Sequence, residues 1–327
     1  MIERSTVLVL GAGASAPYGF PLGDQLRERI IRETGEGDNQ QLREVLVNFG
    51  ESTDAIDDFR NAFQLSAMPS IDSFLARREK FIKVGKAAVA ATIKMCENRF
   101  IFPEPPNYNG TRPDHWYKYL WSKLDASWNE FGENKLRVIT FNYDRSLETF
   151  LLQAITNSFE NRCERECHEM LSNTIPILHV YGAVGGEFGP PNLGMNNWSH
   201  FLTPDRVREA VEGIRVIPES REETPELQAC REWLLAADQI CFLGFGFDST
   251  NLRRLNAAQS CNRVINPGSR LRNVFASAMG LTAREMQQAS ERCGNSCNGM
   301  DVNALPVDFA RSDMDCLATL RYFGVFG

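Results

Sequence analysis

The chain has 327 residues, of which 43% are hydrophobic and 24% are charged, as in ordinary globular proteins that bury a large core. With 35 basic and 42 acidic residues the formal net charge is −7, and no long basic run offsets it, so we expect no direct nucleic-acid binding. No apolar stretch approaches the roughly 18–20 residues of a membrane-spanning helix, so we expect no membrane insertion.

The start of the chain and its cysteines predict a cytoplasmic protein. Met1–Ser5 runs directly into an apolar segment without a secretory signal. The nine cysteines are odd in number and widely spread, which is typical of reduced thiols. Cys163, Cys167 and His168 are close enough in sequence to be considered as metal ligands. Cys293 and Cys297 have the same i, i+4 spacing. Tetrahedral zinc sites usually combine C-x2–4-C pairs with a second pair or with histidines, so we interpret both pairs as free thiols on helix faces and expect no metal.

Five short apolar segments are predicted to form the strands of a parallel sheet, because they are nearly continuous rather than alternating. They are Thr6–Leu10, Arg137–Phe141, Ile175–Tyr181, Gln239–Phe245 and Arg263–Asn266. Each ends near Gly, Asn, Asp or Pro, where a parallel sheet places its ligand-facing loops. Helical patterns occupy the intervals, so the sequence predicts an α/β fold with a Rossmann-like, doubly wound parallel sheet.

The interval between the first two strands is too long for one crossover connection. Residues 27–135 are therefore predicted to form a large helical insertion that covers the ligand edge of the sheet. Its clearest helix begins at the segment SIDSFL, with Ser70 as the N-cap. The insertion interrupts a domain that spans residues 1–270. Residues 271–327 are predicted to be a C-terminal tail that packs on this domain or on a partner.

A glycine-rich turn follows the first predicted strand. Gly11 and Gly13 allow close approach of the backbone, so the amides at the start of the next helix can face a pyrophosphate, and Ser15 can add a hydroxyl donor. The loop continues through Pro21, and no second strand ends in an acidic residue about 20 positions later. Both features count against a dehydrogenase.

Three later segments also place polar or glycine residues at strand ends. In VITFNYDRSLE, Asn142 and Asp144 follow the second strand. Taken alone, these two residues are as consistent with a structural turn or helix cap as with a ligand site. ILHVYGAVGG ends in glycines, and in ICFLGFGFDSTNL Gly244 and Gly246 again allow close approach to the backbone.

In this order, the four motifs resemble those of the Sir2-like family, in which they line one NAD pocket. The family's GAG-x-S turn, T-x-N-x-D loop, H-G strand end and later glycine turn correspond to Gly11–Ser15, Thr140–Asp144, Tyr181–Gly182 and Gly244–Asp248. The resemblance covers about residues 5–27 and 137–270, and the SIDSFL segment looks like members of the prokaryotic defence branch.

The resemblance implies a role for each matching position. It implies that the NAD-binding residues are Gly11, Ala12, Gly13, Ser15, Pro21, Gly244, Phe245, Gly246 and Asn266, with Asn266 near the adenosine ribose. It implies that the catalytic residues are Asn142, Asp144, His179 and Tyr181.

Two departures from the family pattern refine the expected activity. Sirtuin deacylases carry a zinc ribbon, but between Gly182 and Gly244 this chain has only two cysteines, which favours NAD+ cleavage without a peptide acceptor. The family's catalytic histidine should directly precede Gly182, where this chain has Tyr181. His179 lies two residues earlier, on the same face of an extended strand at about 7 Å, so it can reach the pocket while Tyr181 bonds to ribose. The alternative is that His179 is a satisfied core histidine and the enzyme is weak or inactive.

Cleavage of the nicotinamide–ribose bond requires few groups. The transition state resembles an oxocarbenium ion, and the leaving group is a cationic pyridinium that needs no protonation. Asn142 can hold ribose and water, and Asp144 can stabilise charge or orient its loop. A neutral histidine with a pKa near 6.5 can act as the base at cellular pH.

We therefore expect an NAD+ glycohydrolase that yields nicotinamide and ADP-ribose or a cyclic isomer. The resemblance implies a toxic effector of anti-phage defence that depletes NAD+. It also implies control by homo-oligomer assembly or by a separate partner, such as an ATPase, a nucleotide-processing enzyme or an Argonaute-like protein. The alternatives are a non-catalytic module that senses NAD+ or ADP-ribose, and an NAD-dependent protein deacylase.

Overall fold

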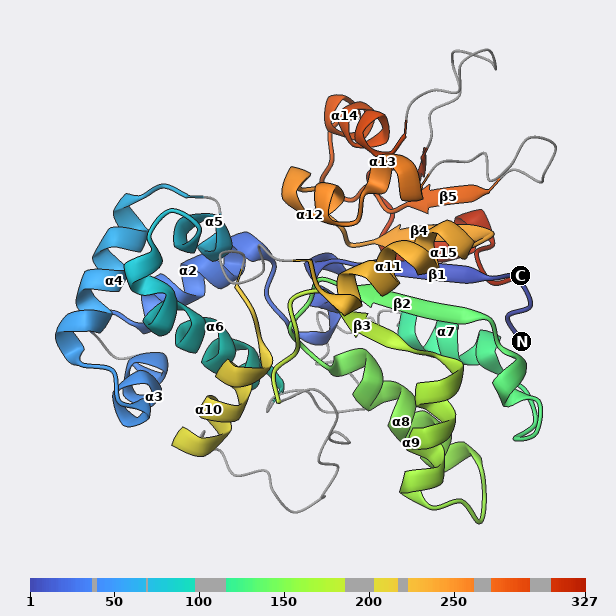
Figure 1. Ribbon diagram of the computed structural model, residues 1–327, viewed down its shortest axis with the longest axis horizontal. Coiled ribbons are helices and arrows are strands. Elements are labelled where there is room, and N and C mark those ends of the chain that lie inside the picture. The colour runs from blue at the N-terminus through green and yellow to red at the C-terminus, as the bar shows by residue number, and fades with distance from the viewer. Residues whose placement is uncertain are drawn as a thin grey trace.

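A six-stranded, all-parallel sheet forms the centre of the molecule (Figure 1). The computed structural model describes residues 1–36, 40–68, 70–97, 116–185, 203–216, 223–261, 272–294 and 307–327. The strands are β1 (Thr6–Leu10), β2 (Leu136–Thr140), β3 (Ile177–His179), β4 (Gln239–Leu243), β5 (Asn273–Ala276) and β6 (Asp308–Phe309). Their spatial order is β3-β2-β1-β4-β5-β6, which is the order of dinucleotide-binding Rossmann sheets.

The first four strands lie within or next to the predicted segments, and β1 has the predicted bounds. The strand expected at Arg263–Asn266 lies outside the described residues. The segment 271–327, expected to be a tail, instead contributes β5 and β6 to the sheet. These strands have four and two residues, which is too short to show a strand period in the sequence.

Helices cover both faces of the sheet, so the fold is doubly wound. They are α7 (Trp116–Leu124), α8 (Ser146–Ser158), α9 (Glu164–Thr174), α11 (Pro225–Ala236), α12 (Ser249–Arg254), α13 (Ala257–Ser260), α14 (Ala283–Cys293) and α15 (Cys316–Phe323). On one face, Tyr117 of α7 meets Phe150 of α8 with ring centroids 5.4 Å apart, and α15 packs beside α7. On the other face, where Figure 1 shows α11, the guanidinium of Arg137 of β2 lies 5.4 Å from the ring centroid of Trp233 of α11.

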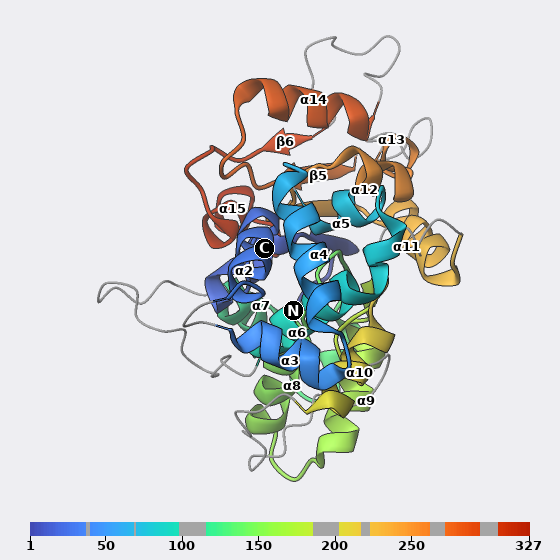
Figure 2. The same ribbon diagram turned by 90° about the vertical axis from the view of Figure 1, so that its left-hand side faces the viewer.

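The predicted insertion is mostly a separate helical layer. Helices α2 (Gly23–Glu33), α3 (Gln41–Phe49), α4 (Thr53–Leu65), α5 (Ile71–Leu75) and α6 (Ile82–Glu97) gather beside α10 (Pro204–Gly213), as Figure 2 shows. Figure 1 places this layer beyond the carboxyl ends of the strands, as expected for a covering insertion. Helix α10 packs on α6 and α3 although it lies outside the predicted range. Helix α7 lies inside that range but packs on the sheet side.

The helix predicted from Ser70 is in fact two helices. Ser70 caps α5, because its Oγ accepts a hydrogen bond from Ser73 N at 3.2 Å. This helix ends at Leu75, and α6 begins at Ile82. The rings of Phe59, Phe63, Phe74 and Phe81 pack together inside the layer, with neighbouring centroids 4.9–6.1 Å apart. Within the described residues, no helix is both long and apolar enough to cross a bilayer.

A buried arginine ties the second half of the sheet to its helices. Arg272 precedes β5, is 3% exposed and donates to the carbonyls of Ala237 (2.7 Å), Ser260 (2.5 Å) and Leu235. Burial lowers the pKa of this guanidinium. Because all three acceptors are neutral main-chain oxygens, the side chain serves to join the end of α11 and α13 to β5.

The two chain ends meet at the amino ends of the strands (Figure 1). Ile2 lies beside the start of β2, where its amide donates to Asn134 Oδ1 at 2.7 Å. The carbonyl of Val325 accepts a hydrogen bond from the side chain of Gln239, the first residue of β4. The carboxyl ends of the strands, where the predicted site residues lie, are at the opposite side of the sheet.

Candidate functional site

The two glycine turns that follow β1 and β4 lock onto each other. Gly11 N donates to Leu243 O and Gly13 N donates to Gly244 O, both at 3.0 Å. A Cβ on Gly11 would lie 2.5 Å from Gly244 O, and one on Gly244, whose φ is +57°, would lie 2.1 Å from Ala14 N. Backbone against backbone leaves no room for a side chain, so glycine is required at these positions.

This contact changes the expected role of the first turn. The amides at the start of the next helix were predicted to face a pyrophosphate, but in this turn the amides of Gly11 and Gly13 donate to Leu243 O of β4 and to Gly244 O. The helix that follows, α1 (Ala12–Ser15), has only one turn. Within the described residues, the amide of Ala12, at the start of α1, has no hydrogen-bond acceptor. In the sheet order described above, β1 and β4 flank the topological switch point, where Rossmann sheets bind their ligands.

Asn142 connects the loop after β2 to this turn, from 131 residues away. Its Nδ2 donates to Gly11 O at 3.0 Å and to Ser15 Oγ at 2.9 Å, and the residue is 9% exposed. Both amide protons are therefore used by the protein. The carboxamide Oδ1 has no partner among the described residues, so it remains able to accept a hydrogen bond from a ribose hydroxyl or a water. The predicted convergence of these two motifs is confirmed by the geometry.

Asp144 is buried and orients the start of α8. Its Oδ1 accepts from Ser146 N at 3.1 Å and from Ser146 Oγ, which also bonds to Tyr117 Oη at 2.7 Å. Burial raises the pKa of Asp144, although the hydrogen bonds from Ser146 and Ser15 oppose the shift. Of the two predicted roles, loop orientation fits this position. A cavity of about 10 Å³ beside Asp144 and Asn142 has room for about one water molecule.

His179 uses both of its ring nitrogens within the protein. Nδ1 lies 2.8 Å from Asn142 O and Nε2 lies 2.6 Å from Glu148 Oε1. Burial opposes charge on both side chains, but their mutual attraction and hydrogen bond outweigh it. The pKa of His179 is raised and that of Glu148 is lowered. Both shifts favour the imidazolium–carboxylate form of this pair, whose side chains are only 12% and 20% exposed. Both ring nitrogens of His179, which was predicted to act as a neutral base, thus have hydrogen-bond partners within the protein.

Tyr181 and His179 have different hydrogen-bond partners. β3 ends at His179, so Tyr181 lies beyond the strand to which the i, i+2 rule was applied. Tyr181 Oη donates to Asn251 Oδ1 of α12 at 2.6 Å, and the Arg254 guanidinium lies 5.1 Å from its ring centroid. Burial raises the pKa of Tyr181, so its hydroxyl stays protonated. The hydroxyl expected to bond to ribose is thus bonded to the protein.

The remaining predicted residues lie around the same sheet edge. Phe245 is buried, and its ring packs edge-on against Phe141 with centroids 5.2 Å apart. Pro21 is half-buried just before α2. A Cβ on Gly246 would meet nothing within 4 Å, so packing does not require glycine there. Asn266 lies outside the described residues.

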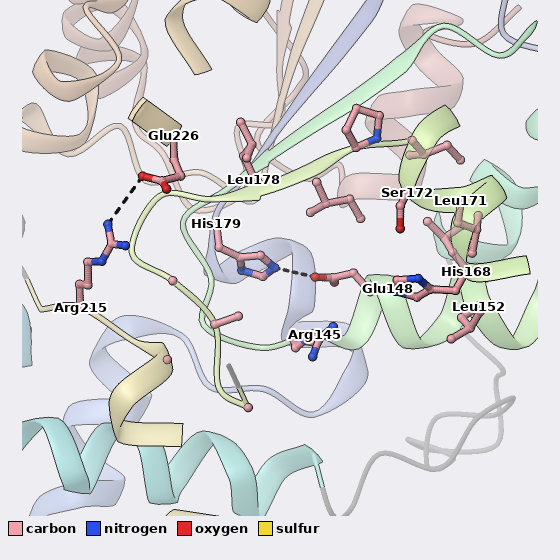
Figure 3. Close-up of a pocket in the computed structure, with 18 of the residues that line it drawn as sticks. Arg145, Glu148, Leu152, His168, Leu171, Ser172, Leu178, His179, Arg215 and Glu226 are labelled. Atoms are coloured by element: carbon pink, nitrogen blue, oxygen red, sulfur yellow. Dashed lines mark hydrogen bonds and ion pairs between the residues drawn. The ribbon is translucent and has the colours of Figure 1, made fainter. Parts of the chain in front are cut away.

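A cavity of about 630 Å³ opens beside the outer edge of β3 (Figure 3). The His179–Glu148 pair lies in one wall, and Arg215 and Glu226 form an ion pair at 3.8 Å on the opposite side (Figure 3). Apolar side chains such as Leu171 fill much of the remaining wall. The cavity therefore gives solvent access to the pair that contacts the Asn142 loop.

Two groups that shape the site were not recognised in the sequence. Glu148 lies four residues after Asp144, so its position near the same end of α8 could have been found from helical spacing. Trp116 donates its Nε1 to Ala14 O at 2.8 Å and so holds the first turn from α7. Nothing local in the sequence signals that contact.

The cysteines of the described chain are free thiols, and among its residues no cluster of three or more His, Cys, Asp or Glu is placed to hold a metal ion. A scan of the sequence against protein-family models finds no match, and a search of the curated proteins finds no relative. The function is therefore argued from the site.

Proposed function

We propose that this chain cleaves the nicotinamide–ribose bond of NAD+, releasing nicotinamide and ADP-ribose. One observation carries the proposal: the Asn142 carboxamide meets the glycine turn and Ser15 at the switch point of a β3-β2-β1-β4-β5-β6 sheet. A dinucleotide is the ligand that such a switch point accommodates. The resemblance of the four motifs to the Sir2-like family supports the same ligand.

The chemistry needs little from the protein beyond position. As the C1′–N bond breaks, the electron pair leaves with the pyridinium nitrogen, so nicotinamide departs neutral and the ribose becomes oxocarbenium-like. Water then adds to C1′ and releases one proton to solvent. Asn142 Oδ1, the acceptor left without a partner, would orient a ribose hydroxyl or this water.

The resemblance to the prokaryotic defence branch supports a role in anti-phage defence by NAD+ depletion. An enzyme that destroys NAD+ has to be restrained until infection. Control by self-assembly or by a separate partner, such as an ATPase, a nucleotide-processing enzyme or an Argonaute-like protein, is part of the proposal.

The test is nicotinamide release from NAD+ by the purified chain, followed by liquid chromatography, with NAD+ affinity measured by calorimetry. We expect Asn142→Ala to lower release by about 10²-fold or more, because transition-state positioning is lost. Asn157→Ala is the matched control, since this exposed asparagine of α8 bonds only to Gln153 O. Release that requires an acyl-lysine peptide would instead indicate a deacylase. Release that is unaffected by Asn142→Ala would contradict the proposed site.

A second candidate is a module that binds NAD+ or ADP-ribose without cleaving it. The engagement of both His179 nitrogens and of the Tyr181 hydroxyl favours it, because neither of these two side chains is then free to act on the ligand. Measurable NAD+ affinity without nicotinamide release, across a range of chain concentrations that permits assembly, would select this candidate.

A further inference from the structure

A chain of two hydrogen bonds joins α8, β3 and the loop after β2. It runs from Glu148 Oε1 to His179 Nε2 (2.6 Å), and from His179 Nδ1 to the main-chain oxygen of Asn142 (2.8 Å). Asn142 is thus held at two points. Its carbonyl is held by β3 and its carboxamide is held by the glycine turn.

The donors in this chain follow from the acceptors. A carbonyl oxygen can only accept, so the proton of the bond to Asn142 resides on His179 Nδ1. A carboxylate likewise accepts, so Nε2 is also protonated while Glu148 is ionised. A ring that carries two protons and uses both in hydrogen bonds cannot take a proton from water or from a ribose hydroxyl.

We propose that His179 is a positioning residue: Glu148 fixes its ring, and the ring holds the Asn142 backbone so that the carboxamide faces the switch point. The proposal rests on the proposed NAD+ cleavage for its kinetic consequence but not for its geometry. It also assigns Glu148 a part in the site. Asp144 and Arg145 are the other charged groups that act on this pair, and Arg145 stabilises the ionised Glu148.

Two substitutions separate positioning from base catalysis. An asparagine at position 179 places its amide NH₂ where Nδ1 stands, so it can still donate to Asn142 O. A glutamine places its amide near Nε2 and loses that donor. We expect His179→Asn to retain kcat within about tenfold of the wild type, and His179→Gln to lower kcat about 10²-fold with KM nearly unchanged. A general base would lose about 10²–10⁴-fold in both variants. His168→Asn, on α9, is the control for loss of a histidine.

A second measurement does not depend on activity. In the full chain labelled with ¹⁵N-histidine, we expect the His179 ring to show protons on both nitrogens at pH 7. We expect Glu148→Gln to shift the loss of the second proton to lower pH. The ring signals of His168, on α9, serve as the internal reference in both proteins.

The outcomes are distinct. Equal and large losses of kcat in His179→Asn and His179→Gln, or a His179 ring with an unprotonated Nδ1 at pH 7, would overturn the positioning role. If the wild type releases no nicotinamide, the proposed function fails, and the nuclear magnetic resonance result alone decides the geometry. A doubly protonated ring that responds to Glu148→Gln supports the assignment in either case.

Discussion

The interlocked glycine turns make a stability prediction that needs no ligand. Adding a Cβ to a glycine can cost free energy in two ways, through a positive φ and through a clash with neighbouring atoms. Substitutions at four glycines separate these two costs. Gly246→Ala meets nothing within 4 Å and has an ordinary φ; Gly19→Ala also meets nothing, but its φ is +88°. Gly11→Ala meets Gly244 O at 2.5 Å without a positive φ, and Gly244→Ala combines a φ of +57° with a contact of 2.1 Å to Ala14 N.

The expected losses of unfolding free energy follow from these two terms. A positive φ costs an L-residue about 1–2 kcal/mol, which is the loss expected for Gly19→Ala. A clash that backbone atoms cannot relieve by rotation costs about 1–3 kcal/mol, which applies to Gly11→Ala. Gly244→Ala incurs both and should lose about 2–5 kcal/mol. Gly246→Ala should change the free energy by less than about 1 kcal/mol.

Guanidinium chloride unfolding followed by circular dichroism measures these differences, provided that the slope with denaturant is the same in all variants. The order of loss should be Gly246→Ala, then Gly19→Ala, with Gly244→Ala the largest. If Gly244→Ala were as stable as Gly246→Ala, the turns would not be locked together as described, and the glycines would have to be explained by a ligand.

Two further predictions concern buried charges. The raised pKa of His179 stabilises the folded protein. This stabilisation is complete below the ordinary pKa of 6.5 and is lost as the pH rises through the raised pKa. The gain from Glu148 is present above its ordinary 4.5 and is lost as pH falls through the lowered pKa. Glu148→Gln should therefore lower the free energy of unfolding most between pH 4.5 and 6.5, as measured by urea unfolding across pH. If the pair were neutral, the difference in unfolding free energy between variant and wild type would not change with pH. Arg272→Met should cost about 2–3 kcal/mol in the same assay, because three main-chain carbonyls lose a donor, and the hydrogen bonds to two of them are buried; a loss below about 0.5 kcal/mol would show that they find other partners.

Local patterns were sufficient to predict the first half of the sheet and the meeting of two motifs. The continuous apolar run before Gly11 and the run before Asn142 have the composition of buried parallel strands, and the carboxyl ends of neighbouring strands must meet at one edge. The Asn142–Gly11 contact follows from that rule.

The proton state and direction of single side chains could not be predicted in the same way. The sequence places His179 two residues before Tyr181, but it does not show that β3 ends at His179 or that its ring contacts Glu148 of α8. The same holds for the glycines, whose spacing suggests a phosphate-binding turn although their closest neighbours are other backbone atoms. Both depend on contacts between segments more than 30 residues apart.

Both termini lie at the amino ends of the strands, on the side away from the carboxyl ends of the strands (Figure 1). A tag, a surface anchor or a fluorescent fusion attached at either end would therefore stand clear of the switch point. Such attachments provide a practical route to immobilise the chain and measure ligand exchange, while the helical layer and the cavity beside β3 stay open to solution.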